Sequence, residues 1–267
     1  MPAVRAGDIE LSYERSGSGP PLLLIMGMSG TSLHWGEPFL ELLRRDFDVI
    51  AYDHRGVGES TRLDGPVTIA QLAEDASALL AALGIESADV LGISMGGMIA
   101  QDLALSHPEQ VRTLTLGCTY CGGPESRATS AAVLGRLADA MSSGDREHAL
   151  RIGWEVNVSP TMAADEAAYA EFLAIAARRA VAIPVVMAQL QACGAHDTST
   201  RLHEISAPTL VIHGTEDEML PVENGRLVAR LIPGSQLEIL DGIGHMFFWE
   251  QPERSAELVR SHAAVPA

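Results

Sequence analysis

Short runs of almost wholly apolar residues recur along the chain, and each is bounded by glycine, proline or charged residues. Continuous runs of this kind are typical of strands buried on both faces of a sheet. Near the N-terminus, residues 9–14 instead alternate between apolar and polar, which predicts a half-exposed edge strand. The buried strands expected from the continuous runs are residues 22–25, 49–52, 90–92, 111–116, 208–213 and 236–240.

Stretches with helical spacing separate several of these strands. Residues 68–83 place apolar side chains three and four positions apart, begin with the capping residue Thr68 and end before Gly84. Helical spacing returns after residue 97, and residues 256–262 predict a closing helix. Strands that alternate with helices predict an α/β fold, with a mostly parallel sheet covered by helices on both faces. Ligands of such sheets bind beyond the carboxyl ends of the strands.

The alternation stops between residues 122 and 200. This stretch is rich in alanine, methionine and other helix formers and contains no clear strand. We therefore expect a single α/β core, made of residues 1–121 and 201–267, that is interrupted by a helical insertion of residues 122–200. The helices expected in the insertion are residues 131–141, 145–156, 163–179 and 181–192.

Composition narrows the chemistry available to the chain. Its 267 residues are 47% hydrophobic, which is enough for a sizeable core. The net charge of −17 argues against a nucleic-acid partner, since phosphates are bound by clustered cations. All 18 basic residues are arginine. The absence of lysine excludes Schiff-base chemistry, a pyridoxal phosphate anchor, a Ser-Lys dyad and a Walker-type phosphate loop.

The pattern of apolar residues gives no sign of a membrane segment or a leader. No run approaches the roughly 18 apolar residues of a membrane-spanning helix. Residues 1–10 include Arg5, Asp8 and Glu10 and lack the apolar core of a signal peptide. We therefore expect a cytoplasmic protein with no membrane partner.

A serine lies between two glycines where a predicted strand gives way to a helix. Residues 92–96 read Gly-Ile-Ser-Met-Gly, at the end of the strand expected at residues 90–92. A turn this tight holds the serine backbone in a strained conformation, and side chains at Gly92 and Gly96 would collide with their surroundings. The hydroxyl of Ser94 is then exposed beyond the strand end, as at a nucleophile elbow.

An acid and a histidine follow in the loops after two later strands. Asp217 lies four residues past the strand at 208–213, and His245 lies on a glycine-rich loop after the strand at 236–240. Serine, acid and histidine in this order, each at a strand end, match the roles of a catalytic triad. His213 ends an apolar strand, so we expect it to pack or to satisfy a backbone group. The rival candidates are Glu216 and Glu218 for the acid, and His203 and His213 for the base.

These residue types together support nucleophilic catalysis on a carbonyl group. A serine hydroxyl is a weak nucleophile until a base removes its proton, which His245 would do before returning the proton to the leaving group. Asp217 would hold the imidazole tautomer and stabilise the imidazolium. Two backbone N–H groups would bind the oxyanion, that of Met95 after the nucleophile and that of Met28 after the first buried strand, where Gly27 frees the turn.

Several motifs together resemble those of the α/β-hydrolase superfamily, and they cover almost the whole chain. One matches the family's D-x-R-G-x-G-x-S loop, and the segment around Ser94 is similar to 3-oxoadipate enol-lactonases and related carboxylesterases. The resemblance implies a mostly parallel, twisted sheet flanked by helices, a helical cap of residues 122–200 over the active site, and catalysis without a cofactor. One departure is Met26-Gly27, where many members carry His-Gly at the oxyanion loop. The matching segments are residues 53–60, 93–101, 107–111, 207–214 and 244–245.

Candidate substrate contacts come from the cap and from the strand ends. Apolar side chains of the cap would line the pocket, and among them we single out Trp154 and Met187. Amphipathic helices usually bury most such side chains in their own packing. Gly27 and Cys118 would contact the substrate from the core. Cys118 and Cys121 form a C-x-x-C pair, but without a second pair or a histidine cluster this pair does not predict a metal site.

The predicted function is hydrolysis of a small-molecule carboxylic ester or lactone through an acyl-enzyme on Ser94. A serine at the elbow excludes haloalkane dehalogenases and epoxide hydrolases, which carry aspartate there. Three alternatives stay open: a C–C bond hydrolase of the meta-cleavage type, a cofactor-free perhydrolase, and a hydrolase-like ligand-binding protein with negligible turnover. The sequence leaves the oligomeric state undetermined, and a homodimer is compatible with it.

Overall fold

Eight strands form one sheet in the computed structural model, which describes residues 1–264. The strand order is β1-β2-β4-β3-β5-β6-β7-β8. Neighbours from β4 to β8 run parallel, whereas β2 is antiparallel to both β1 and β4. The mostly parallel sheet predicted from the sequence is thus confirmed. The strands are β1 (Ala3–Ala6), β2 (Ile9–Gly17), β3 (Pro21–Ile25), β4 (Asp48–Tyr52), β5 (Ala88–Ile93), β6 (Val111–Gly117), β7 (Thr209–Gly214) and β8 (Gln236–Leu240).

The edge strand predicted at residues 9–14 does not lie at the edge. β2 pairs with β1 through residues 9–12 and with β4 through residues 13–17, so it has a neighbour on each side. Ile9 and Leu11 are buried in the core, whereas Glu10 between them is exposed. This part of β2 has one face on the core and one toward solvent, which accounts for the alternating sequence. The outer strand β1 has four residues, too few for its pattern to predict it.

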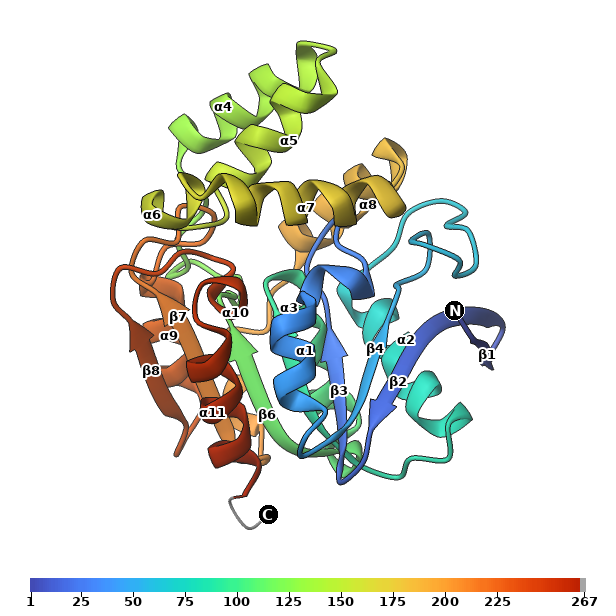
Figure 1. Ribbon diagram of the computed structural model, residues 1–267. Coiled ribbons are helices and arrows are strands. Elements are labelled where there is room, and N and C mark those ends of the chain that lie inside the picture. Colours follow the sequence, from blue (N-terminus) through green and yellow to red (C-terminus); the bar gives the residue numbers. More distant parts are fainter. Residues whose placement is uncertain (265–267) are drawn as a thin grey trace.

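Helices cover both faces of the sheet (Figure 1). The alternation along β3 shows why its sequence is continuously apolar: Leu23 belongs to the core cluster on one face, and Leu22 and Leu24 belong to the cluster on the other. The first cluster receives side chains from α2 (Ile69–Ala82), α3 (Met95–Ser106) and α9 (Glu223–Leu231). The second receives them from α1 (Glu37–Leu43), α10 (Phe247–Glu250) and α11 (Pro252–Ala263).

Five helices lie between β6 and β7, at the end of the sheet toward which β3 and β6 point (Figure 1). They have an apolar cluster of their own, built on Trp154, Val158 and Tyr169. Asp165 caps α7 by accepting two backbone N–H groups, which is why this helix begins three residues later than predicted. The helices are α4 (Ala131–Ser142), α5 (Arg146–Glu155), α6 (Pro160–Ala163), α7 (Glu166–Arg178) and α8 (Ile183–Ala195).

The division into a core and a cap stays a prediction, and residues 265–267 of the predicted core lie outside the described residues. No single helix within residues 1–264 has the length and apolar character to cross a membrane. α7 and α8 reach that length and composition only as a pair, and they are bent by 107° relative to each other. Three short 3-10 helices complete the described chain: η1 (Ser32–Trp35), η2 (Pro108–Gln110) and η3 (Leu202–Glu204).

Candidate active site

Ser94 occupies a strained turn between β5 and α3. Its backbone has φ 56° and ψ −123°, a conformation that residues with a side chain rarely adopt. A Cβ atom at Gly92 would lie 2.2 Å from the carbonyl oxygen of Gly96, and one at Gly96 would lie 1.9 Å from that of Ile25. Both positions therefore require glycine, in agreement with the steric argument made from the sequence.

Asp217 and His245 form a buried hydrogen-bonded pair in the loops after β7 and β8. His245 Nδ1 donates to Asp217 Oδ2 at 2.7 Å, and the second carboxylate oxygen accepts the N–H of Leu220 at 2.8 Å. Burial raises the pKa of Asp217, but the rings of His245 and His213 lower it, and the net pKa lies well below its usual range. An ionised Asp217 holds the hydrogen of His245 on Nδ1, which leaves Nε2 free to act as a base.

The rival acids and bases have other positions. His213 is fully buried, and its Nε2 lies 2.7 Å from the carbonyl oxygen of Leu220 and 3.1 Å from Asp217 Oδ2. His213 therefore satisfies a backbone group, as expected from the sequence, and it also contacts the acid. The remaining rivals are exposed: Glu216, Glu218 and His203.

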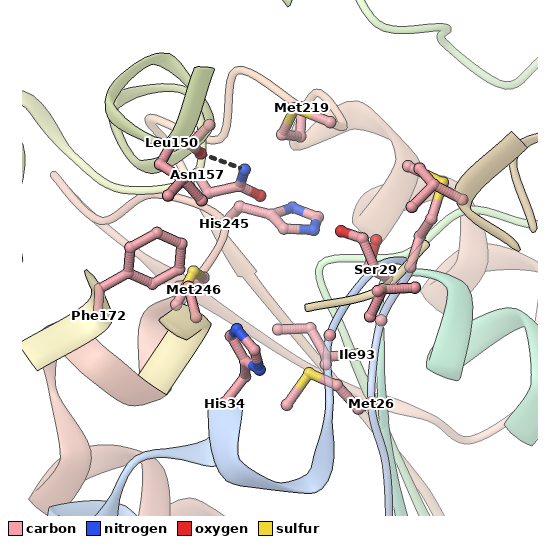
Figure 2. A pocket seen from close by; sticks show the side chains of 18 of the residues that line it. Met26, Ser29, His34, Ile93, Leu150, Asn157, Phe172, Met219, His245 and Met246 are labelled. Atoms are coloured by element: carbon pink, nitrogen blue, oxygen red, sulfur yellow. Dashed lines mark hydrogen bonds between the residues drawn. The ribbon is translucent and has the colours of Figure 1, made fainter. Parts of the chain in front are cut away.

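Ser94 and His245 line one cavity of about 370 Å³. Figure 2 shows His245 above the centre of this space, with side chains from the inserted helices and from the loop after β3 facing it. The lining is mostly apolar, as in many sites that bind small organic molecules. Its larger apolar residues are Met26, Met28, Ile93, Leu150, Phe172, Val181, Val186, Met219, Met246 and Phe248. Its polar side chains, besides Ser94 and His245, are Ser29, His34, Arg146, Asn157 and Arg179.

The loop after β3 lies against Ser94 and carries one of the predicted oxyanion donors. Gly27 and Met28 line the cavity, and a Cβ atom at Gly27 would lie 3.1 Å from Ser94 Cβ. Met95 is the first residue of α3, so its N–H has no carbonyl partner one turn earlier in the helix. Both positions are compatible with the oxyanion role, which stays a prediction.

Two buried side chains, Gln189 and His54, form hydrogen bonds to the backbone of this loop. Ser29 has φ 61°, in the left-handed region, and donates its N–H to Oε1 of Gln189 in α8 at 2.9 Å. The ring of His54 donates from Nε2 to the carbonyl oxygen of Met26 at 2.9 Å. Sequence reasoning missed both contacts. Gln189 is 160 residues from Ser29 in the chain, and no motif connects the two.

Three residues predicted to contact substrate lie outside the cavity. Cys118 is fully buried just after β6, and Trp154 is fully buried among the inserted helices, where it packs on Phe172. Met187 is exposed on α8 and lines a separate surface groove. The structure does not bring these three side chains to the cavity, because an apolar pattern does not tell which apolar surface a side chain meets. Gly27 is the predicted contact that lines the cavity.

Cys118 nevertheless approaches the candidate acid and base. Its Sγ, an oxygen of Asp217 and a ring nitrogen of His245 all lie within 4.8 Å of one another. Cysteine, aspartate and histidine are ligands that zinc prefers. Burial raises the pKa of the Cys118 thiol well above its usual range, so beside the carboxylate of Asp217 the thiol is protonated. The carboxylate of Asp217 and the imidazole of His245 already bond each other. We therefore interpret Cys118 as a side chain that packs behind this pair in the candidate active site.

Comparison with known proteins identifies the family of the chain. Residues 20–252 match the family model of the alpha/beta hydrolase fold. A poly(3-hydroxyalkanoate) depolymerase of Ectopseudomonas oleovorans is 32% identical, over 90% of this chain and 82% of that protein. The 3-oxoadipate enol-lactonase 2 of Acinetobacter baylyi is 30% identical, over 93% of this chain and 91% of that protein. The crystal structure of a hydrolase from Pseudomonas aeruginosa PA01 is similar with a TM-score of 0.83 at 30% identity, covering 98% of both chains. The chain therefore belongs to the α/β-hydrolase fold family.

Proposed function

We propose that this protein is a serine hydrolase that cleaves a carboxylic ester or lactone through an acyl-enzyme on Ser94. The geometry around one cavity carries the proposal. Ser94 sits on a strained turn at that cavity, His245 lines it, and His245 Nδ1 bonds the buried Asp217 at 2.7 Å. The relatives named as a poly(3-hydroxyalkanoate) depolymerase and an enol-lactonase support cleavage of ester-type bonds.

The proposed reaction uses groups of this chain alone. His245 takes the hydroxyl proton as Ser94 Oγ attacks the carbonyl carbon. The N–H groups of Met28 and Met95 stabilise the oxyanion, and each such donor is typically worth about 2.7–4 kcal/mol. The imidazolium, stabilised by Asp217, protonates the leaving alkoxide as the acyl-enzyme forms. Water, deprotonated by His245, then attacks the acyl carbon, and Ser94 Oγ leaves and is reprotonated.

The lining of the cavity supports a substrate with a small or medium apolar acyl group. We extend the proposal to a small-molecule substrate that is processed in the cytoplasm, without a metal, a cofactor, a nucleic acid or a membrane as partner. A homodimer is compatible with the proposal.

The test is hydrolysis of p-nitrophenyl esters from acetate to decanoate, with an enol-lactone in parallel, by the wild type and by Ser94→Ala. We expect the substitution to abolish turnover of both substrate types without loss of the folded state. Ser142→Ala, at an exposed serine of α4, is the matched control and should keep full activity. Equal turnover by Ser94→Ala and the wild type would overturn the proposal.

A folded wild type that cleaves neither esters nor the lactone would favour one of the alternatives. Turnover of a ring-fission diketone would then indicate a C–C bond hydrolase, and peracid formation from a carboxylic acid and peroxide would indicate a perhydrolase. Ligand affinity without any turnover would indicate a binding protein.

A further inference from the structure

His34 projects its imidazole into the cavity that Ser94 lines. It belongs to the 3-10 helix η1, which follows the loop after β3. Figure 2 shows the ring at the lower side of the cavity, between Phe172 and Met26 and below Met246. The ring meets that of Phe172 edge-on, with centroids 6.0 Å apart. The catalytic steps proposed above make no use of this histidine.

Thr31 fixes one side of the His34 ring. The backbone N–H of Thr31 lies 3.0 Å from Nδ1, and Thr31 Oγ1 lies 2.9 Å from the same nitrogen. A backbone N–H can only donate, so Nδ1 must present a lone pair to it. The neutral ring therefore carries its single hydrogen on Nε2. Within residues 1–264 the hydrogen bonds of this ring all involve Nδ1, so the Nε2–H group is open to a ligand.

The ring stays neutral over the ordinary pH range. A second proton would have to sit on Nδ1, against the N–H of Thr31. Burial lowers the pKa of His34 to about 4, although the charge of Asp53 acts in the opposite direction. At neutral pH His34 is therefore an uncharged hydrogen-bond donor with a fixed direction.

We propose that His34 determines substrate specificity, because its Nε2–H group binds an acceptor oxygen in the part of the substrate that fills the cavity. The inference rests on the proposed function and deepens it. It names the substrate class as esters or lactones that carry a second oxygen, such as an ether, ketone or hydroxyl oxygen. Bond cleavage itself remains with Ser94 and His245.

The neighbours of the ring make this preference effective. The ring of Phe172 meets that of His34, and Met26 and Met246 line the same cavity; none of these three side chains offers a strong acceptor for the Nε2 hydrogen. A hydrocarbon group would displace water from Nε2–H without replacing the hydrogen bond, and a buried donor left without a partner is destabilising. A site that contains such a donor discriminates against an analogue lacking the acceptor more strongly than an apolar wall discriminates between chain lengths.

The experiment uses matched p-nitrophenyl esters and His34 variants. One substrate is the hexanoate, and its partners replace one methylene of the chain by an ether oxygen at successive positions. The quantity measured is kcat/KM of each ether ester divided by that of the hexanoate. Comparing this ratio between variant and wild type cancels the intrinsic activation that an oxygen near the carbonyl causes. The variants are His34→Phe, which removes the donor, His34→Gln, which restores one, and Met219→Leu, a change of cavity shape away from His34.

We expect the wild type to prefer the ether ester for at least one oxygen position. His34→Phe should lower that preference about 10-fold, the scale of one unpaired donor, whereas His34→Gln should recover most of it. Met219→Leu should leave the ratio unchanged. An unchanged ratio in His34→Phe would overturn the inference, and so would an equal loss in His34→Gln or in Met219→Leu, since the shape of the cavity would then be the cause. If His34→Phe does not fold, His34→Leu takes its place.

The outcome also separates this inference from the proposed function. Hydrolysis of both ester types with no effect of His34 would overturn the role of His34 and leave the serine hydrolase intact. Hydrolysis of neither type by the folded wild type would overturn the proposed function, and the inference would fall with it.

Discussion

At the scale of single residues, Asp217 holds the site together because its carboxylate has several partners. Its Oδ2 accepts from His245, its Oδ1 accepts the N–H of Leu220, and the ring of His213 lies 3.1 Å from Oδ2. His213 itself cannot shift easily, since even a Cβ atom at Gly225 would come within 2.6 Å of its Nδ1. A buried carboxylate with this many donors keeps both its charge and its orientation.

Replacing Asp217 by Asn tests its role directly. We expect kcat to fall about 10⁴-fold with a much smaller change in KM, because an amide can stabilise the wrong tautomer of His245. Steady-state kinetics on the preferred p-nitrophenyl ester measures the effect, and Glu218→Gln, at an exposed neighbour, is the control. A kcat within tenfold of the wild type would remove Asp217 from the triad.

His213→Leu should change how the fold responds to acid. The pKa of Asp217 in the folded protein is lower than its unfolded value, so the carboxylate stabilises the fold above about pH 4 and this stabilisation is lost as the pH falls through the folded pKa. Without His213 the folded pKa rises toward its usual value, so the variant should lose this stabilisation at a higher pH. Urea unfolding between pH 3 and 7 measures the difference. The matched control is His203→Leu, at an exposed histidine. If the stability of His213→Leu and of the wild type depended on pH in the same way, His213 would not act on Asp217.

At the scale of secondary-structure elements, the contact between α3 and the sheet decides where Ser94 lies. The first turn of α3 approaches β3 so closely that a single methyl group at Gly96 would meet the backbone of Ile25. The same approach brings the loop after β3, with Met28, next to the nucleophile. The tight packing of these elements therefore sets both the strain at Ser94 and the distance to its predicted oxyanion donor.

Gly96→Ala should be severely destabilising, whereas another Gly→Ala change in a helix should not. A Cβ atom 1.9 Å from a backbone oxygen forces β3 and α3 apart, and we expect a loss of about 4 kcal/mol or more in the free energy of unfolding. Gly135→Ala in α4 meets nothing within 4 Å and should stabilise the protein by about 0.5–1 kcal/mol. Urea denaturation of both variants checks the pair. A typical point mutation destabilises a protein by about 1 kcal/mol. If the free energy of unfolding of Gly96→Ala fell by no more than this, the steric argument would be contradicted.

At the scale of the whole molecule, the inserted helices and the sheet are joined at the oxyanion loop. Gln189 is 1% exposed and accepts the N–H of Ser29, whose φ of 61° is in the left-handed region. Met28, the predicted oxyanion donor, is the preceding residue. A movement of α8 would therefore be transmitted to the predicted oxyanion donor through one hydrogen bond.

Removing this bond should affect catalysis more than binding. We expect Gln189→Leu to lower kcat about tenfold with little change in KM, because the loop loses one hydrogen-bonded anchor of about 1 kcal/mol and Met28 shifts. Gln189→Glu keeps an acceptor oxygen and should recover part of kcat, and Gln191→Leu, at an exposed position of the same helix, should have no effect. A change confined to KM in Gln189→Leu would show that the residue acts on substrate binding instead.

The sequence predicts the fold best where a strand is buried on both faces. The run of β3 is continuously apolar because its residues 22–25 alternate between two core clusters, which makes every position a buried one. The position of β2 could not be predicted, because its environment depends on β1, whose four residues become a strand only by pairing. The long helices of the insertion lie where the apolar spacing predicts them. The start of α7 is an exception, because Asp165 caps the helix and fixes its first residue at Glu166.

The candidate site is predictable to the extent that it depends on chain order. Ser94, Asp217 and His245 each follow a strand, and parallel strands bring their ends to one edge. His34 and Gln189 follow no such rule. Gln189 bonds a backbone N–H that lies 160 residues away in the chain, and only the tertiary structure brings the two together. The bond between Thr31 and His34 is local, but the cavity that the His34 ring lines is formed by segments far apart in the chain.

The place of β8 in the strand order has a consequence for the working lifetime of the protein. β8 is the last strand of the sheet, pairs with β7 and is partly exposed along most of its length, yet the loop that follows it carries His245. Edges of this kind open locally before a domain unfolds, whereas Ser94 follows the fully buried β5. We expect heating or urea to abolish turnover before circular dichroism reports any loss of helix. The half-life of activity is then set by the fraying of one strand. Strengthening the β7–β8 pair should lengthen this half-life without raising the melting temperature of the whole molecule.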